Sequence, residues 1–185
     1  AGAIFEYGTE EQKDEHLFSL VRGQKMGLFA ITEPEAGSDV SAISCRARKD
    51  GDSYVLNGTK TWISNATVFD VGVIFVKTDT EAGRRGISAF IIEKGAPGLT
   101  CSEISPKMGH HCSPTGMLFL EDVRLPASSL LGKENEGFKL CMKALDRGRL
   151  SVAAGALGVA QACLDLSVEY ANQRVQFGRP ISEYQ

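Results

Sequence analysis

Between residues 27 and 121 the chain consists of short runs of strand-forming residues separated by glycine, asparagine, aspartate and proline. So many short strands at close spacing predict a β-barrel or a β-sandwich. Asn57-Gly58 lies between two of the runs and predicts a hairpin turn, because both residues tolerate positive φ. The expected strands are 27–31, 44–49, 54–56, 60–63, 71–77, 87–93, 99–104 and 117–121.

Both flanks of this strand-rich region have a helical pattern. Residues 10–22 place Leu17, Phe18, Leu20 and Val21 among polar positions, which suits the closing helix of a preceding helical domain. After Pro126 residues that suit one helix face recur at three- and four-residue steps, which predicts a long helix. These positions are Phe138, Cys141, Met142, Leu145, Leu150, Ala153, Ala154, Leu157, Ala160, Gln161, Leu164 and Val168.

Composition and charge exclude several partners. The chain has 185 residues, enough for one large domain or a domain plus part of another. A hydrophobic content of 43% allows a core, and the net charge of -3 gives no reason to expect nucleic acid or an anionic membrane. The longest uncharged run, residues 150–164, is too short to span a bilayer and contains Gly155 and Gly158. We therefore expect a buried helix there, with no membrane partner and no signal peptide.

The cysteine and histidine spacing does not indicate a metal site. Five cysteines are scattered without a C-x-x-C pair, which favours a reducing compartment. His110, His111 and Cys112 are adjacent, whereas zinc sites commonly use two separated pairs of ligands. No metal is expected.

Residues 29–39 (FAITEPEAGSD) take an apolar strand directly into a loop of hydroxyls, carboxylates and one glycine. Pro34 biases Glu33 toward an extended conformation, and Gly37 permits either an unusual backbone geometry or the close approach of a ligand. The loop is suited to holding a polar ligand. An ordinary junction between a strand and a turn is the alternative interpretation.

Two later strings have similar features. Residues 60–65 (KTWISN) contain the only tryptophan, Trp62, next to a hydroxyl and an amide, which suits either a wall beside a planar cofactor or a core position. Residues 174–181 (RVQFGRPI) place Arg174 before Gly178. An arginine there could bind a pyrophosphate, or it could complement a helix dipole at a C-terminus that ends at the glycine.

These three strings, in this order and spacing, resemble the acyl-CoA dehydrogenase family of flavoproteins, and residues 121–126 (EDVRLP) between them add to the resemblance. It extends from residues 7–13 (YGTEEQK) to Gln185 and implies a fragment of a longer enzyme. The implied fold class is an α+β multidomain fragment, with a middle β-barrel domain followed by the first long helix of an α-helical bundle domain. The implied parts are the end of an N-terminal helical domain in 1–26, the middle domain in 27–129 and the start of the C-terminal domain in 130–185.

The resemblance also implies the chemistry. An acyl-CoA would lose its α-proton to a carboxylate base and its β-hydrogen as hydride to FAD, giving a trans-2-enoyl-CoA. Ser64 stands where the family more often has threonine, so the hydroxyl expected to face the flavin N5 is kept. Acyl-CoA contacts would come from Ser38, Asp146 and Arg149, although the last two could equally form a surface pair. FAD contacts are implied for Phe29, Ile31, Thr32, Gly37, Ser38, Trp62, Ile63 and Ser64, and, toward the FAD of a neighbouring subunit, for Arg174, Gln176, Phe177, Tyr184 and Gln185.

One position bears on the catalytic base. In the family this glutamate comes either from the residue before the arginine that corresponds to Arg149 or from a much later segment. Here the first position is Gly148, which cannot take a proton. The resemblance therefore implies a base beyond Gln185, as in short-chain, medium-chain and isobutyryl-like members.

The partners implied are acyl-CoA as substrate, an electron-transfer flavoprotein as electron acceptor, and further copies of the chain in a dimer or tetramer that shares FAD sites. The bacterial cytoplasm or the mitochondrial matrix would suit such an enzyme. Two alternatives stay open: a flavoenzyme that passes electrons to O₂, like the acyl-CoA oxidases or nitroalkane oxidase, and a noncatalytic module that binds CoA or a partner. O₂ consumption and a dehydrogenase assay of the full-length protein separate them.

Overall fold

A computed structural model describes residues 1–185, and the contacts within it divide the chain into two units, Ala1–Met142 and Lys143–Gln185. The first unit contains the N-terminal helices, the β-sheet and the first residues of a long helix. The second contains the rest of that helix and a small hairpin at the end of the chain.

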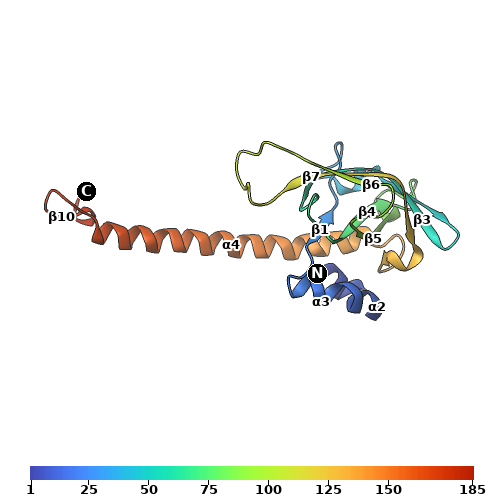
Figure 1. Cartoon of the computed structure of the whole chain (residues 1–185), viewed down its shortest axis with the longest axis horizontal. Coiled ribbons are helices and arrows are strands. Elements are labelled where there is room, and N and C mark those ends of the chain that lie inside the picture. Colours follow the sequence, from blue (N-terminus) through green and yellow to red (C-terminus); the bar gives the residue numbers. More distant parts are fainter. The chain divides into compact units, whose positions relative to one another are not determined.

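The first unit is built on an eight-stranded mixed sheet (Figure 1). The strands pair in the order β6-β7-β3-β2-β4-β5-β8, and β1 pairs in parallel with β4. The end strands of this path, β6 and β8, are not paired with each other. The strands are β1 (Gly27–Ala30), β2 (Arg46–Asp50), β3 (Ser53–Ser64), β4 (Val71–Lys77), β5 (Ile87–Glu93), β6 (Leu99–Glu103), β7 (Thr115–Pro126) and β8 (Leu130–Leu131).

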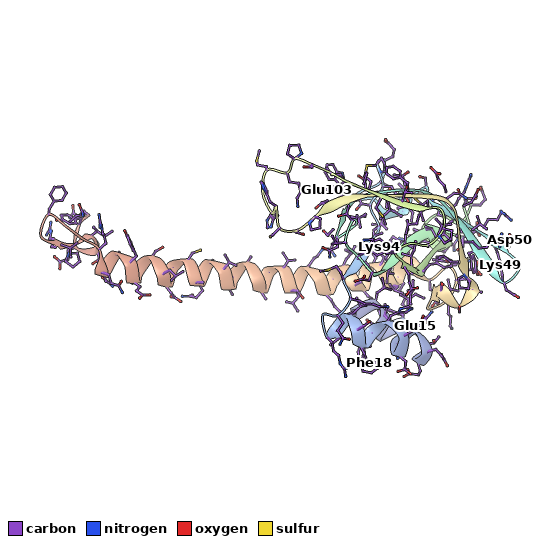
Figure 2. All side chains as sticks on the ribbon, viewed as in Figure 1. Glu15, Phe18, Lys49, Asp50, Lys94 and Glu103 are labelled. Carbon is purple, nitrogen blue, oxygen red and sulfur yellow. The ribbon has the colours of Figure 1, made fainter.

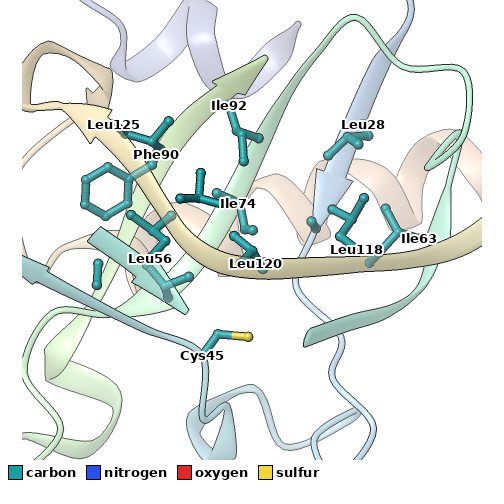
Figure 3. Close-up of a cluster of buried hydrophobic side chains, with 14 of the residues drawn as sticks. Leu28, Cys45, Leu56, Ile63, Ile74, Phe90, Ile92, Leu118, Leu120 and Leu125 are labelled. Atoms are coloured by element: carbon teal, nitrogen blue, oxygen red, sulfur yellow. The ribbon is translucent and has the colours of Figure 1, made fainter. Parts of the chain in front are cut away.

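The sheet curls around one hydrophobic core (Figure 3). Strands β4 and β5 are buried along nearly their whole length, and Ile74 lies opposite Phe90 in their antiparallel register. Leu28 of β1, Leu56 of β3 and Leu118 of β7 reach the same cluster, so strands from across the sheet share one interior. The predicted fold class, a β-barrel domain followed by a long helix, is confirmed.

The hairpin predicted at Asn57-Gly58 is wrong, because β3 runs without a turn from Ser53 to Ser64. The turn lies earlier, at Gly51 and Asp52, where Asp50 of β2 pairs with Ser53 of β3 (Figure 2). At Asn57 the strand instead has an irregularity in its pairing with β7. The Asn57 side chain exchanges two hydrogen bonds with Asp122, of 2.9 and 3.0 Å, which fixes this irregularity.

Gly58 is required at this irregularity by its backbone and by its neighbours. Its φ is +137°, and a Cβ there would lie 2.4 Å from the Cys45 sulfur. We expect Gly58→Ala to lower the free energy of unfolding by about 1–3 kcal/mol, because both backbone strain and overpacking cost that much. Gly51→Ala is the control, since Gly51 also has positive φ but open space around it. Equal losses in urea denaturation of the two variants would contradict the packing argument.

The N-terminal helices are attached to the sheet by side-chain hydrogen bonds. Thr9 and Gln12 cap each other's backbone, and the Gln12 amide also donates to the carbonyls of Ser128 and Leu130 at 2.7 and 3.0 Å. The helix expected over 10–22 is present in three consecutive pieces, and the helix before it was not predicted. The segments are α1 (Gly2–Tyr7), α2 (Glu10–Gln12), a π-helical turn (Lys13–Leu17) and α3 (Phe18–Val21), and 3₁₀ turns occur at Val40–Ala42, Gly83–Gly86, Ala127–Ser129 and Ile181–Glu183.

The long helix α4 (Gly137–Gln173) has its predicted place, but its exposure differs from the prediction. Gly137, Leu140 and Cys141 are buried in the first unit, whereas Leu150 is 75% and Leu157 72% exposed. The expected burial of residues 150–164 is therefore wrong for this chain, because nothing in it covers them. By length and composition alone α4 could cross a membrane, which for one helix is weak evidence.

After the long helix the chain forms a short β-hairpin, and Gly178 lies in its turn and does not end the helix. The helix already ends at Gln173, after which β9 (Val175–Gln176) pairs with β10 (Arg179–Pro180). Phe177 and Gly178 form the turn with φ values of 49° and 83°. Two successive residues with positive φ are typical of a tight hairpin turn. Gly178 therefore belongs to this hairpin turn and is not the C-terminal cap of α4.

Candidate cofactor and substrate site

The polar loop after β1 begins with a tight turn. The Glu33 N–H donates to the Ala36 carbonyl at 2.9 Å, and the Ala36 N–H donates back to the Glu33 carbonyl at 3.1 Å. Pro34 and Glu35 form the exposed corner of this turn. The loop therefore leaves β1 in a fixed direction and presents its following residues, 37–39, to solvent.

Of the two properties expected of Gly37, an unusual backbone geometry is not found. Its φ is not in the left-handed region, so no unusual backbone geometry requires glycine there. A Cβ added at Gly37 would meet nothing within 4 Å. The space above the residue is thus open, which permits the close approach of a ligand.

The strand end that carries Trp62 meets this loop through a β-bulge. Lys60 lies opposite Leu118 and Ile63 opposite Gly116, so three steps along β3 match two along β7 and one residue is extra. The bulge frees the Thr61 N–H from the sheet, and it donates instead to the Thr32 carbonyl at 2.9 Å. The strings 29–39 and 60–65, predicted separately, are brought together here.

Trp62 occupies the bulge with its side chain directed out of the barrel. Its φ is +57° and the residue is 64% exposed, both uncommon for a tryptophan in a strand. Bulges of this kind redirect a side chain and are frequent beside functional sites. The possibility that Trp62 is a core residue is therefore wrong.

The other residues expected at the flavin divide into buried and accessible ones. Ile31 and Ile63 are buried, so only their main chain could reach a ligand. Phe29 is partly exposed and packs edge-to-face on Phe75, with ring centroids 4.9 Å apart. Thr32 is partly exposed, whereas Ser38 and Ser64 are exposed. Their three hydroxyls have no hydrogen-bond partner within the chain.

A buried ion pair lies directly beneath the junction, and the sequence did not indicate it. Lys60 is 0% exposed, and its Nζ donates to Glu33 Oε1 and to the Ile31 carbonyl, both at 2.8 Å. The Glu33 carboxylate also accepts hydrogen bonds from the Ser44 N–H (2.5 Å), the Ser44 hydroxyl (2.8 Å) and the Cys45 N–H (3.0 Å). A lysine within a predicted strand was the signal that could have revealed it.

The electrostatics of this pair favour two charged partners. Burial alone raises the pKa of Glu33, but the Lys60 ammonium and the hydrogen bonds from Ser44 and Cys45 outweigh it, so the pKa lies below its usual value. This contribution to stability is complete above the ordinary carboxyl pKa and is lost as the pH falls through the lowered one. Burial raises the pKa of the neighbouring Cys45 thiol to about 12, which keeps it protonated.

The predicted residues of the second unit form two groups. Asp146 and Arg149 make a 3.0 Å ion pair on one exposed face of α4. Arg174 follows the helix end, where its carbonyl accepts a hydrogen bond from Ile181.

The terminal hairpin brings the remaining predicted residues into contact. The Tyr184 hydroxyl donates to the Gln176 carbonyl at 2.8 Å, its ring meets Phe177 edge-to-face, and the Arg179 guanidinium lies 4.1 Å from that ring. Gln185 is exposed beside them. Arg179, which was not among the predicted site residues, thus belongs to the same cluster.

By distance alone, one group of three side chains is close enough to hold a metal ion. His110 and Cys112 lie exposed in the loop before β7. Glu15, His16 and Glu93 are close together, but the two ring nitrogens of His16 face different carboxylates. Nε2 lies 3.6 Å from Glu15, and Nδ1 lies 3.8 Å from Glu93. Each ring nitrogen of His16 therefore has a different carboxylate as its neighbour.

The sequence matches two family profiles along most of its length. The acyl-CoA dehydrogenase middle domain matches residues 28–123, and the acyl-CoA dehydrogenase C-terminal domain matches residues 135–185. The chain belongs to the acyl-CoA dehydrogenase family. The strings 29–39 and 60–65, which form the junction of loop and bulge, lie in the middle-domain match. The string 174–181 lies near the end of the C-terminal match.

Individual relatives agree with this assignment. The short-chain-specific acyl-CoA dehydrogenase of Megasphaera elsdenii is 47% identical over 186 residues, which cover 100% of this chain and 49% of the relative. Acryloyl-CoA reductase (NADH) of Anaerotignum propionicum is 48% identical over 185 residues, which cover 99% of this chain and 47% of the relative. The chain therefore spans about half the length of the curated relatives it matches.

A solved structure shows the same fold. The structure, described as the electron-transferring flavoprotein of Acidaminococcus fermentans, superposes with a TM-score of 0.94 at 48% identity. The match covers 100% of this chain and 48% of the solved chain.

Proposed function

We propose that the full-length protein is an FAD-dependent acyl-CoA dehydrogenase that oxidises acyl-CoA to trans-2-enoyl-CoA. The observation that carries the proposal is the junction between the loop after β1 and the bulge in β3. There an exposed indole lies at the same strand end as hydroxyls that have no partner within the chain. A planar apolar face with nearby donors and acceptors suits the ring system of a flavin.

The exposed groups fit FAD by their chemistry. Trp62 would cover the ring system, while the hydroxyls of Thr32 and Ser64 would hydrogen-bond its polar edge. When bound, the flavin supplies the hydride acceptor. Ser38, next to the open space at Gly37, is a proposed contact of acyl-CoA. Asp146 and Arg149 of the second unit are proposed as further contacts.

The terminal hairpin would serve the FAD of a neighbouring copy in a dimer or tetramer. Phe177 is 96% exposed at its tip, so its ring is accessible to such a copy. The other contributors would be Arg174, through its guanidinium, and Gln176, Tyr184 and Gln185.

The catalytic base would lie beyond Gln185, because Gly148 occupies the earlier possible position. Short-chain or medium-chain acyl-CoA would then be the substrate class, which the short-chain-specific relative supports. The proposed domains are the end of an N-terminal helical domain in 1–26, the middle domain in 27–129 and the start of the C-terminal domain in 130–185. The proposed location is the bacterial cytoplasm or the mitochondrial matrix.

A second candidate is the reverse reaction, reduction of an enoyl-CoA. It is favoured by the 48% identity to acryloyl-CoA reductase (NADH), since the same flavin site could work in either direction. An electron-transfer flavoprotein is the proposed partner of either enzyme.

Steady-state assays of the full-length protein distinguish these functions. A dehydrogenase forms enoyl-CoA from acyl-CoA with an electron-transfer flavoprotein or a dye as acceptor. An oxidase consumes O₂, and a reductase consumes enoyl-CoA. A noncatalytic module does none of these, and that result would contradict the proposal.

Arg174 tests the shared cofactor site. We expect Arg174→Ala to lower both FAD retention and oligomer stability, whereas Arg174→Lys should restore the charge without the bidentate geometry and recover FAD only in part. Gel filtration with detection of flavin absorbance measures both. Arg124→Ala is the matched control, because Arg124 pairs with Asp50 on the exposed surface of the barrel. Full flavin retention by Arg174→Ala would favour a purely structural role.

A further inference from the structure

We propose that the buried pair of Lys60 and Glu33 positions the flavin-binding junction, and thereby sets the affinity for FAD and the environment of its ring system. This inference rests on the proposed function. Neither residue would touch the cofactor. Both would act through the main chain to which they are hydrogen-bonded.

Lys60 connects the two strings that form the junction. It lies in β3 two residues before Trp62, and its Nζ donates to the carbonyl of Ile31, the residue before Thr32. The neighbouring bond from the Thr61 N–H to the Thr32 carbonyl runs between the same two segments. The ammonium therefore fixes the distance between the loop after β1 and the strand end that carries the indole.

Glu33 holds the loop at both of its ends. At the start of the loop it is paired with Lys60, and at the far end its carboxylate accepts hydrogen bonds from Ser44 and the Cys45 N–H. The intervening segment contains Gly37 and Ser38, which are exposed. The Glu33 carboxylate therefore links the beginning and the end of the loop that contains Gly37 and Ser38.

Stability alone does not account for a charged pair at this place. Removing two charges from water is costly, and apolar residues of similar volume often serve a protein core as well or better. The surrounding barrel is filled with such residues, including Leu118 directly opposite Lys60. A requirement for fixed geometry explains why the charges are kept, because charged hydrogen bonds are short and directional.

The test uses three variants of the full-length protein, namely Lys60→Met, Glu33→Gln and the double variant. The single variants leave one charge or polar group buried without its partner, so both stability and FAD affinity should fall. The double variant leaves no unpaired charge and should recover most of the thermal midpoint of the apoprotein. It still lacks the bond from Nζ to the Ile31 carbonyl. We therefore expect its Kd for FAD to stay raised about tenfold or more, as for the loss of a charged hydrogen bond.

Three readouts separate positioning from folding: the thermal midpoint of the apoprotein, the Kd for FAD from flavin fluorescence, and the visible spectrum of bound flavin. Positioning predicts a shifted spectrum in the double variant. Arg124→Met removes an exposed pair of the same barrel and should change neither the Kd nor the spectrum. A double variant with wild-type stability, a Kd within twofold of wild type and an unchanged spectrum would overturn the inference.

Ser44→Ala keeps the test decisive if the double variant does not fold. The Ser44 side chain is accessible and loses only its 2.8 Å bond to Glu33, so the fold should be kept. We expect a Kd for FAD raised about fivefold, since a hydrogen bond contributes on the order of 1 kcal/mol. An unchanged Kd would also contradict the inference. If the wild-type protein binds no FAD, both the proposed function and this inference fail. If acyl-CoA reduces the bound flavin but the variants keep the wild-type Kd for FAD and the wild-type spectrum, only the positioning role fails.

Discussion

Residues 1–185, supplied with excess FAD, are expected to show no dye reduction with any acyl-CoA. The resemblance to the family leaves two positions for the base, and one of them is Gly148. Loss of a general base alone lowers the rate by about 10² to 10⁴. The chain also leaves the apolar positions of α4 uncovered, among them Leu150 and Leu157, so it could not enclose a substrate from water.

The full-length protein is the control for this experiment, assayed at the same FAD concentration. Circular dichroism of residues 1–185 should show that the sheet is folded, so that inactivity is not caused by unfolding. Turnover within tenfold of the full-length protein would place a base inside these residues. That result would contradict both the Gly148 argument and the short-chain-like assignment.

Trp62→Ala in the full-length protein should weaken FAD binding about a hundredfold or more. Loss of a buried tryptophan side chain costs about 3–5 kcal/mol, and 1.4 kcal/mol corresponds to a factor of ten. The residue is exposed in this chain, so the stability of the apoprotein should change by no more than about 0.5 kcal/mol. Fluorescence titration of the apoprotein with FAD measures the first effect and thermal unfolding the second.

Trp62→Phe is the matched variant, because it keeps an apolar ring at the same position in the bulge. We expect it to retain most of the affinity that Trp62→Ala loses. FAD content and turnover that are unchanged in Trp62→Ala would show that the indole faces solvent or a protein partner instead of the flavin.

The sequence predicted best those elements whose local pattern leaves one solution. Strands β4 and β5 have the predicted bounds, because each is a continuous apolar run between turn-forming residues and is buried on both faces. The long helix was predicted by its spacing of apolar residues. Its exposure was not, since burial depends on elements outside the helix itself.

The predictions at Gly58 and Gly178 are wrong because a glycine is compatible with several local structures. A glycine with positive φ suits a hairpin turn, a bulge or a helix end, and local sequence does not choose among them. Gly58 lies in a strand irregularity because Cys45, thirteen residues earlier in the chain, approaches it closely. At Gly178 the choice is made by the pairing of Gln176 with Arg179.

The sequence indicates the polar strings of the candidate site but not the buried ion pair beneath them. The roles of Thr32 and Trp62 at the flavin are implied by the family resemblance, and the strings that contain them stood out by their polar residues beside apolar strands. Lys60 did not, because a lysine in a strand faces either solvent or the core depending on register. Its position opposite the buried Leu118 becomes visible only with the pairing of β3 and β7.

The most direct test of the account is anaerobic addition of butyryl-CoA to the purified full-length protein, followed by its visible spectrum and by chromatography of the CoA esters. We predict that the protein is isolated with FAD, and that its flavin absorbance is lost as a trans-2-enoyl-CoA forms in equal amount. A protein that retains FAD but stays oxidised with straight, branched and dicarboxylic acyl-CoA esters would contradict the proposed function. So would a protein that binds no flavin.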